Sequence, residues 1–335
     1  MNLENSNTEI EPENPPITKK GIKRFIVPSL GTGSWMTRTR RLAVRVFLWY
    51  VVIVIVIAFL QRKLIYHPTR SSTRLFAVES RLMRGTVHGI EIETHDGLIL
   101  NGWHFLPRCE KSASRDENDR ILKESSWLVL YFPGNAGNRQ MRQYDAEVFT
   151  RNGANVFLFD YRGYGENPGS PSEANLLKDA RAVWNFATNE RNVPANKIIL
   201  FGESLGGGVA VQLCADLCEE GTPPAGLFLV GTFSSLVDVA AFHFPVVPVR
   251  WIMWDRYQSI DRTISITCPV AQIHGRRDEI VPFEFGQRLF DSFPKQSATG
   301  IEKQMLELTD VGHDNIPAGP MQNFVRKFIR KLGLN

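Results

Sequence analysis

Cysteine is scarce in this chain. There are four among 335 residues, none in a Cys-x-x-Cys pair or at a spacing from histidine that is typical of zinc sites: Cys109, Cys214, Cys218 and Cys268. We therefore expect no structural metal. Cys214 and Cys218 lie one turn apart in a predicted helix, where free thiols are expected and a disulfide between them is geometrically awkward. Cysteine content thus leaves the redox compartment open.

Runs of one charge are also missing. The net charge is only +4, and the basic residues are spread along the chain without interleaved aromatic residues. Proteins that bind nucleic acid usually gather basic residues in one run or on one face. We therefore expect no nucleic-acid partner.

Only one long apolar run is present. Leu42 to Leu60 carries a single charge, Arg45, near its start. At about 1.5 Å of rise per residue, a helix of this length nearly crosses a hydrocarbon core of about 30 Å. A buried strand over Val51 to Ile57 and a cleaved signal peptide are the alternatives. The run is too long for a typical strand, and no small-x-small cleavage site follows Leu60. We expect an uncleaved, single-pass signal anchor at residues 42–60.

The segment before this run, residues 1–41, is polar and has little apolar periodicity, which predicts a disordered tail. Four basic residues flank the run on each side: Arg38, Arg40, Arg41 and Arg45 before it, and Arg62, Lys63, Arg70 and Arg74 after it. Further basic residues stand on the N-terminal side: Lys19, Lys20, Lys23 and Arg24. The positive-inside rule then favours a cytoplasmic tail and an extracytoplasmic catalytic domain.

Residues 61–86 are expected to form a linker, and residues 87–335 a single catalytic domain. The domain opens with a predicted hairpin through His95-Asp96-Gly97. After a polar insert, short apolar runs alternate with longer amphipathic stretches, which favours a mostly parallel sheet with helices on both faces. The predicted strands are VHGIEIET, LILNGWHF, WLVLYF, NVFLFD, KIILFG, GLFLVG, PVAQIHG and QMLELTD.

A Gly-x-Ser-x-Gly motif, Gly202 to Gly206, follows the predicted strand KIILFG and precedes a predicted helix. An ordinary strand-to-helix turn fits the same residues. In this context, however, the motif is typical of a nucleophile elbow, whose glycines leave room for the strained turn that presents the serine hydroxyl. We therefore predict Ser204 as a catalytic nucleophile.

A serine nucleophile needs a general base, and elbow enzymes carry their acid and then their histidine after the serine. His313 follows the last predicted strand and is the predicted base; His243 and His274 also follow the elbow but lie earlier in the domain. The acid should follow the penultimate strand, where Asp278 stands. Asp238 is the main rival, and Asp310 and Asp314 are too close in sequence to His313 to orient it easily.

The oxyanion of an acyl-transfer intermediate needs two preorganised N–H donors, one after the nucleophile and one in the loop after an earlier strand. These are predicted to be the backbone N–H groups of Leu205 and Asn135. Asn135 lies in a glycine-rich loop that also fits a plain turn with Asn138 as a helix cap.

Together these motifs resemble the α/β-hydrolase superfamily, and within it the membrane-anchored group that includes the Bem46-like hydrolases and the α/β-hydrolase-domain proteins 12, 13 and 17. The resemblance covers roughly residue 87 to the C-terminus and rests on PGNAGN, FDYRGYGENPGSPSE, FGESLGGG, IHGRRDEIVPF and VGHDN. One departure is Pro133, where that group usually has histidine. The loop at Asp160 to Gly165 also matches, and we interpret it as a structured neighbour of the site.

The resemblance implies an α/β-hydrolase fold and a serine hydrolase that cleaves carboxylic esters, often lipid or acyl-thioester substrates, without metal or organic cofactor. A serine peptidase or acyl-peptide hydrolase, and a non-catalytic membrane scaffold, are the alternatives. A short aromatic insert between GLFLVG and PVAQIHG is predicted to be a lid that packs on the domain or forms one wall of an acyl pocket. Small-molecule or lipid esters and the membrane are the expected partners.

Overall fold

The computed structural model describes residues 35–71, 73, 86–108, 110–125 and 127–334. Two compact units divide the chain at the boundary between Ile53 and Val54. Most of the predicted tail lies outside the described residues, but its last residues, from Trp35, already belong to a helix. The second unit, Val54–Asn335, holds every predicted site residue.

Helix α1 (Trp35–Ile65) contains the predicted anchor. Its stretch Thr37–Ile65 contains an 18-residue window with a mean hydropathy of 2.7, and by length and composition it could cross a membrane. The helix ends at Ile65 rather than at Leu60, so the start of the predicted linker is helical. The reason is tertiary: Gln61 and Tyr66 are buried against the catalytic unit, and contacts there stabilise the last turns.

An eight-stranded sheet forms the centre of the second unit, in the order β10-β9-β8-β7-β4-β6-β3-β2. Its first two strands in sequence, β2 and β3, form the predicted antiparallel hairpin, β3 also pairs antiparallel with β6, and all other pairs are parallel. All eight predicted strands are present: β2 (Val87–Glu93), β3 (Ile99–Phe105), β4 (Leu128–Phe132), β6 (Asn155–Phe159), β7 (Ile198–Glu203), β8 (Gly226–Val230), β9 (Val270–Gly275) and β10 (Gln304–Leu308).

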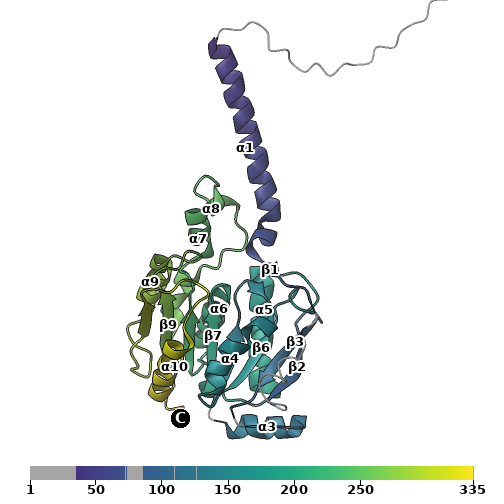
Figure 1. Ribbon diagram of the computed structural model, residues 1–335, viewed down its shortest axis with the longest axis vertical. Coiled ribbons are helices and arrows are strands. Elements are labelled where there is room, and N and C mark those ends of the chain that lie inside the picture. The colour runs from purple at the N-terminus through teal and green to yellow at the C-terminus, as the bar shows by residue number, and fades with distance from the viewer. Residues whose placement is uncertain (1–34, 72, 74–85, 109, 126, 335) are drawn as a thin grey trace, which may run out of the picture. The chain divides into compact units, whose positions relative to one another are not determined.

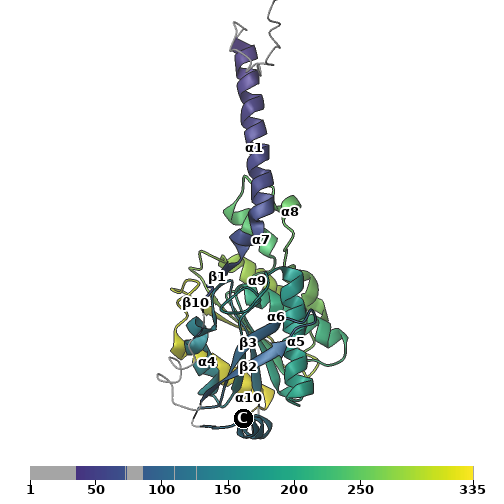
Figure 2. The same ribbon diagram turned by 90° about the vertical axis from the view of Figure 1, so that its right-hand side faces the viewer.

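Helices cover both faces of this sheet (Figure 1; Figure 2). The interior strands are buried along their whole length because side chains of alternate residues point to opposite faces, and both faces are covered. One core packs against α5 (Glu173–Asn185), α6 (Leu205–Glu219) and α9 (Phe283–Ser292). The other packs against α4 (Gln143–Thr150) and α10 (Ala318–Leu332).

The remaining elements are short. The polar insert before β4 holds α3 (Arg115–Glu124), whose N-cap is Ser114; the sequence pattern had indicated only an insert there. The residues β1 (His67–Pro68) and β5 (Ala136–Gly137) form a second, two-stranded parallel sheet. Between β8 and β9 the predicted lid contains α7 (Leu236–His243) and α8 (Val249–Ile252), and 3₁₀ or π turns complete the chain at 139–142, 186–190, 195–197 and 259–265.

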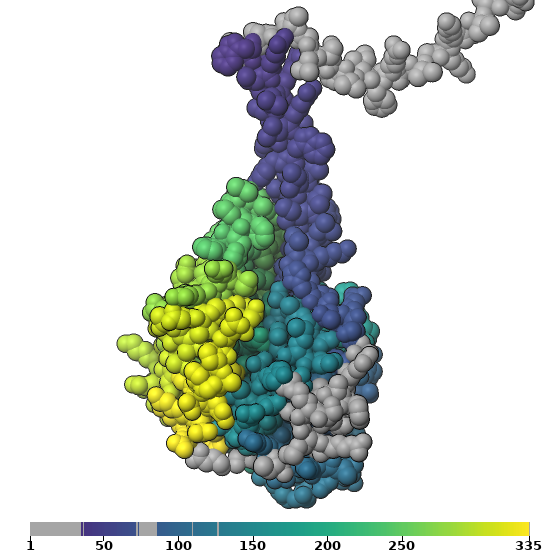
Figure 3. Space-filling view, in the orientation of Figure 1, coloured from purple at the N-terminus to yellow at the C-terminus, as the bar shows by residue number. Residues whose placement is uncertain are grey.

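The lid packs on the last turns of α1, within the second unit. Gln61 donates to the Ile252 carbonyl at 3.0 Å, and the Arg62 guanidinium pairs with buried Asp255 at 2.9 Å. Phe59 and Trp254 meet edge to face. In Figure 3 the green lid lies against the blue end of α1. The sequence pattern assigned these last turns of α1 to the anchor and the linker. The contacts with the lid instead place them beside the site.

Candidate active site

The turn between β7 and α6 has the strained geometry of a nucleophile elbow. Ser204 has φ 50° and ψ −117°, a left-handed region that side chains other than glycine rarely occupy. The turn needs close backbone contacts: a Cβ at Gly206 would lie 2.0 Å from the Phe132 carbonyl oxygen, and one at Gly202 would lie 2.6 Å from the Gly206 carbonyl oxygen. The two flanking glycines therefore leave the space that this turn of the backbone at Ser204 requires.

The structure brings the three predicted triad residues together. His313 Nε2 lies 3.0 Å from Ser204 Oγ, and His313 Nδ1 lies 2.7 Å from Asp278 Oδ2. Ser204 follows β7 and caps α6, Asp278 follows β9, and His313 follows β10, so all three lie at the carboxyl ends of parallel strands. These distances are those of a nucleophile, a base within reach of its proton, and an acid that orients the base.

Asp278 is held by more than His313. Its Oδ1 accepts hydrogen bonds from the backbone N–H groups of Ile280 at 3.0 Å and Val281 at 2.7 Å. His274 Nε2 approaches Oδ2 to 3.3 Å, and its ring is fully buried behind the carboxylate. The carboxylate therefore has one fixed orientation, with Oδ1 bound by the main chain and Oδ2 turned to the two imidazoles. Sequence reasoning missed His274; its position four residues before Asp278, at the end of β9, was the available signal.

Burial and hydrogen bonding shift the pKa values of Asp278 and His313 in opposite directions. Burial alone would raise the pKa of Asp278, but hydrogen bonds from His274 and His313 lower it below its ordinary value. Burial alone would lower the pKa of His313, but the hydrogen bond and charge of Asp278 raise it above 6.5. The aspartate is thus ionised at neutral pH and can stabilise an imidazolium.

This geometry predicts the acid limb of the pH profile. If His313 must be neutral to accept the Ser204 proton, kcat/KM should rise with pH as the imidazolium loses its proton. Because the pKa of His313 is raised above 6.5, we expect the midpoint of that rise above pH 6.5. Initial rates on a short, water-soluble ester between pH 5 and 9 measure it. A midpoint well below 6.5 would contradict the raised pKa.

The rival acid lies elsewhere. Asp238 is in the first turn of α7 and pairs with Arg250 at 2.6 Å and Arg288 at 3.3 Å. Asp310 pairs with Arg277 on the surface. The structure therefore brings only Asp278, among the candidate acids, within hydrogen-bond distance of His313.

The predicted oxyanion donors flank the nucleophile. Leu205 is the first residue of α6, and Asn135 lies beside the elbow in the loop after β4. Within the part of the chain that the structure describes, neither backbone N–H donates a hydrogen bond to another backbone group. The loop is held by its carbonyls: Tyr161 Oη donates to Pro133 O at 2.9 Å, and Tyr164 Oη donates to Asn135 O at 2.7 Å. The loop at Asp160 to Gly165 thus supports the oxyanion loop. Asn138 also caps a short helix, as the sequence indicated.

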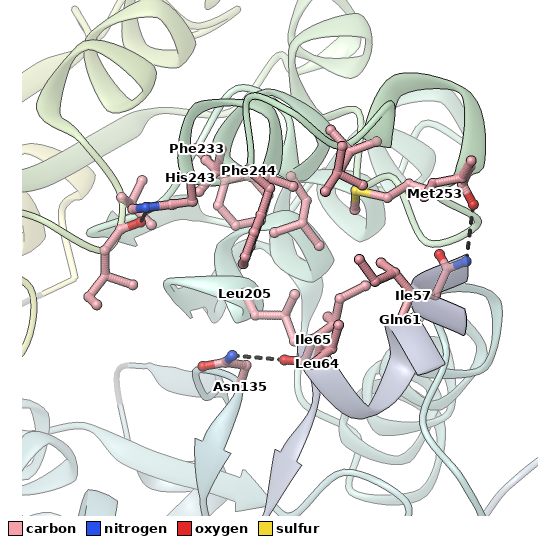
Figure 4. Close-up of a pocket in the computed structure, with 18 of the residues that line it drawn as sticks. Ile57, Gln61, Leu64, Ile65, Asn135, Leu205, Phe233, His243, Phe244 and Met253 are labelled. Atoms are coloured by element: carbon pink, nitrogen blue, oxygen red, sulfur yellow. Dashed lines mark hydrogen bonds between the residues drawn. The ribbon is translucent and has the colours of Figure 1, made fainter. Parts of the chain in front are cut away.

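An apolar cavity of about 520 Å³ opens beside Ser204 (Figure 4). Its walls come from three places: the oxyanion loop with α6, the lid, and the end of α1. Four residues of α1 line the cavity: Ile57, Gln61, Leu64 and Ile65. Their part in the cavity was not expected, because the hydropathy of this segment predicts only a membrane span. The lid and strand-end residues include Phe233, Leu236, Val239, Ala240, Phe244, Val249 and Met253.

Two groups of side chains in the described part of the chain bring potential metal ligands together: Cys214, Cys218 and Cys268, and His95, Asp96 and Asp179. The thiols are free, with the Cys214 and Cys268 sulfurs 3.4 Å apart, and the two aspartates are bound by Arg162. Neither group lines the cavity beside Ser204.

The fold and the elbow define a protein of the α/β-hydrolase class. Solved structures agree on the fold: an esterase of Pyrococcus furiosus, Pf2001, superposes with a TM-score of 0.58 at 18% identity, covering 80% of this chain and 98% of that one. An α/β hydrolase of Vibrio vulnificus gives a TM-score of 0.53 at 16% identity, covering 79% and 95%. The family model described as serine aminopeptidase, S33, matches residues 123–254.

Several proteins are similar to this chain in sequence. An uncharacterized protein of Mycobacterium tuberculosis is 37% identical over 277 residues, which is 82% of this chain and 89% of the relative. The lysophosphatidylserine lipase ABHD12 of Danio rerio is 30% identical over 61% of this chain and 58% of its own length. The chain is an α/β hydrolase by its fold and these matches, and it belongs to the same family as the mycobacterial protein.

Proposed function

We propose that this protein hydrolyses carboxylic esters of long acyl chains through an acyl-enzyme on Ser204. The observation that carries the proposal is the hydrogen-bonded series Ser204, His313 and Asp278 at the edge of an apolar cavity. The lipase and esterase names of its relatives and structural neighbours support an ester substrate.

The mechanism is a double displacement. His313 Nε2 accepts the Ser204 proton while Oγ attacks the acyl carbonyl, and the Asn135 and Leu205 N–H groups bind the oxyanion. When the tetrahedral intermediate collapses, the bond between the acyl carbon and the alcohol oxygen breaks. The imidazolium gives its proton to that oxygen. Water, deprotonated by His313, then releases the fatty acid and restores the serine hydroxyl.

We propose that the membrane supplies the substrate. Helix α1 acts as the anchor, with the N-terminal side cytoplasmic and the catalytic domain on the opposite side, and residues 54–65 of the same helix form one wall of the acyl cavity. The lid beside this wall exposes several large apolar side chains: Phe242, Phe244, Val246, Trp251 and Trp254. Contiguous exposed apolar residues of this kind are typical of a membrane-facing surface. Acyl chains can then enter without crossing water.

A peptidase would use the same triad, and the matching family model carries an aminopeptidase name. The lining beside Ser204 favours an acyl chain, because most of its side chains are apolar. A non-catalytic scaffold is disfavoured by a complete and correctly spaced set of triad residues.

Acyl-chain profiling tests the proposal. Purified full-length protein in detergent should react with a fluorophosphonate probe, and kcat/KM on p-nitrophenyl esters should rise by about fourfold per methylene from acetate until the cavity is filled. Filling the cavity with Ala240→Phe should lower the ratio of laurate to acetate activity. Aminoacyl-p-nitroanilides serve as the peptidase comparison. Faster cleavage of these amides than of esters, or no dependence on chain length, would refute the proposal.

A further inference from the structure

A second cavity, of about 370 Å³, lies next to the base of the triad. His313 lines this cavity, whereas Ser204 lines the apolar one, and the two side chains are joined by the 3.0 Å hydrogen bond. The lining differs in character from the first, because one arginine and three acidic side chains contribute to it: Arg142, Asp145, Glu203 and Asp314. Tyr131, Met141, Ile316 and Met321 complete much of the wall.

The reaction requires the two cavities to bind different parts of an ester, the acyl chain in one and the alcohol in the other. His313 must deliver its proton to the alcohol oxygen that leaves, so the alcohol has to lie on the histidine side of the reacting carbon. The acyl chain then extends the other way, into the apolar cavity. This assignment rests on the proposed function, since it applies only if Ser204 forms an acyl-enzyme.

The charges of the second cavity do not balance. Its single guanidinium, Arg142, is already paired with Glu203 at 3.1 Å. Tyr131 Oη donates to Glu203 at 2.6 Å and lies 3.5 Å from Asp145. Burial raises the pKa of Asp145 to about 6, which leaves it largely ionised at neutral pH. Three carboxylates, those of Glu203, Asp145 and Asp314, thus share this cavity with one guanidinium.

The charged groups stand close to the reacting atoms. A Cβ placed on Gly134 of the oxyanion loop would lie 3.5 Å from Ser204 Cβ, 3.5 Å from the Arg142 guanidinium and 3.6 Å from a Glu203 carboxylate oxygen. An alcohol bound at the acyl carbonyl would therefore reach these groups within a few bonds. A group of positive charge on that alcohol would meet the excess carboxylates, whereas a neutral or anionic one would gain less or be repelled.

We propose that this cavity is the leaving-group site and that it selects esters whose alcohol carries an ammonium group. The preferred substrate is then an amphiphile with an acyl chain for the apolar cavity and a cationic or zwitterionic alcohol for the polar one. Asp145 and Asp314 determine this preference, and Arg142 with Glu203 forms the rigid floor between the cavity and the elbow.

A matched pair of substrates tests the charge alone. The decanoyl ester of choline and that of 3,3-dimethylbutanol have nearly the same shape and differ by one positive charge. Full-length protein should show about a fivefold higher kcat/KM for the choline ester at low salt, as expected of one charged group at a partly solvated site, and the ratio should fall with rising salt. The ratio of the two kcat/KM values is divided by the ratio of the rates at which hydroxide cleaves the same esters. A corrected ratio of one or below overturns the proposal.

Variants assign the preference to the cavity. Asp145→Asn and Asp314→Asn should each lower the corrected ratio severalfold, because each removes one carboxylate from the cavity. Asp291→Asn in α9 is the matched control, since it removes a carboxylate outside both cavities and should leave the ratio unchanged. Unchanged ratios in both cavity variants would also overturn the assignment. If neither ester is cleaved and no probe labelling occurs, it is the proposed function that fails.

Discussion

Replacing Ser204 with alanine is expected to lower kcat/KM for esters by about five to six orders of magnitude, because the nucleophile of the acyl-enzyme is lost. Fluorophosphonate labelling should disappear with it. The fold should persist, since the change removes one oxygen from a turn whose conformation is set by Gly202 and Gly206. Stopped assays with high enzyme concentration and in-gel fluorescence measure the two losses.

A matched serine variant separates loss of the nucleophile from general damage. Ser292→Ala, at the end of α9 and outside both cavities, should keep labelling and turnover. Both variants should melt within a few degrees of the parent in circular dichroism. Persistent labelling of Ser204→Ala at the parent rate would remove Ser204 from the mechanism, whatever the activity of the control.

Local patterns were sufficient to predict the sheet and three side chains that lie together at its edge, Ser204, Asp278 and His313. Each interior strand is a short apolar run bounded by polar or glycine residues. Such runs predict strands well here because both faces of a parallel sheet are buried. The elbow could be found because its glycines are required at fixed distances from Ser204. His313 and Asp278 followed from chain order, since the ends of successive parallel strands meet at one edge of the sheet.

Features that depend on distant segments could not be predicted. Ile57 and Leu64 line the acyl cavity only because the lid, nearly 200 residues later in the sequence, packs against the end of α1. Hydropathy describes such residues identically whether they face lipid, a lid or a substrate. The polar cavity likewise needs Arg142, Glu203 and Asp314, whose positions in the sequence carry no common pattern.

The largest expected effect outside the nucleophile is at the acid. Asp278→Asn should lower kcat/KM by about four orders of magnitude, while Asp238→Asn should change it by less than about threefold. The reason lies in the fixed orientation of Asp278: because Oδ1 accepts from the Ile280 and Val281 N–H groups, an asparagine keeps its carbonyl oxygen there. Its amide NH₂ then faces His313 Nδ1.

An amide donor at that position selects the wrong tautomer of His313. With Nδ1 forced to accept, Nε2 carries the proton and cannot take one from Ser204 Oγ, 3.0 Å away. Asp278→Glu is the informative second variant: it keeps a carboxylate but shifts it, so it should retain more activity than Asp278→Asn if tautomer control dominates. Asp238 has no such role, because it is paired with Arg250 and Arg288 at the surface. A larger loss at Asp238 than at Asp278, in variants with equal melting temperatures, would transfer the role of the acid to Asp238.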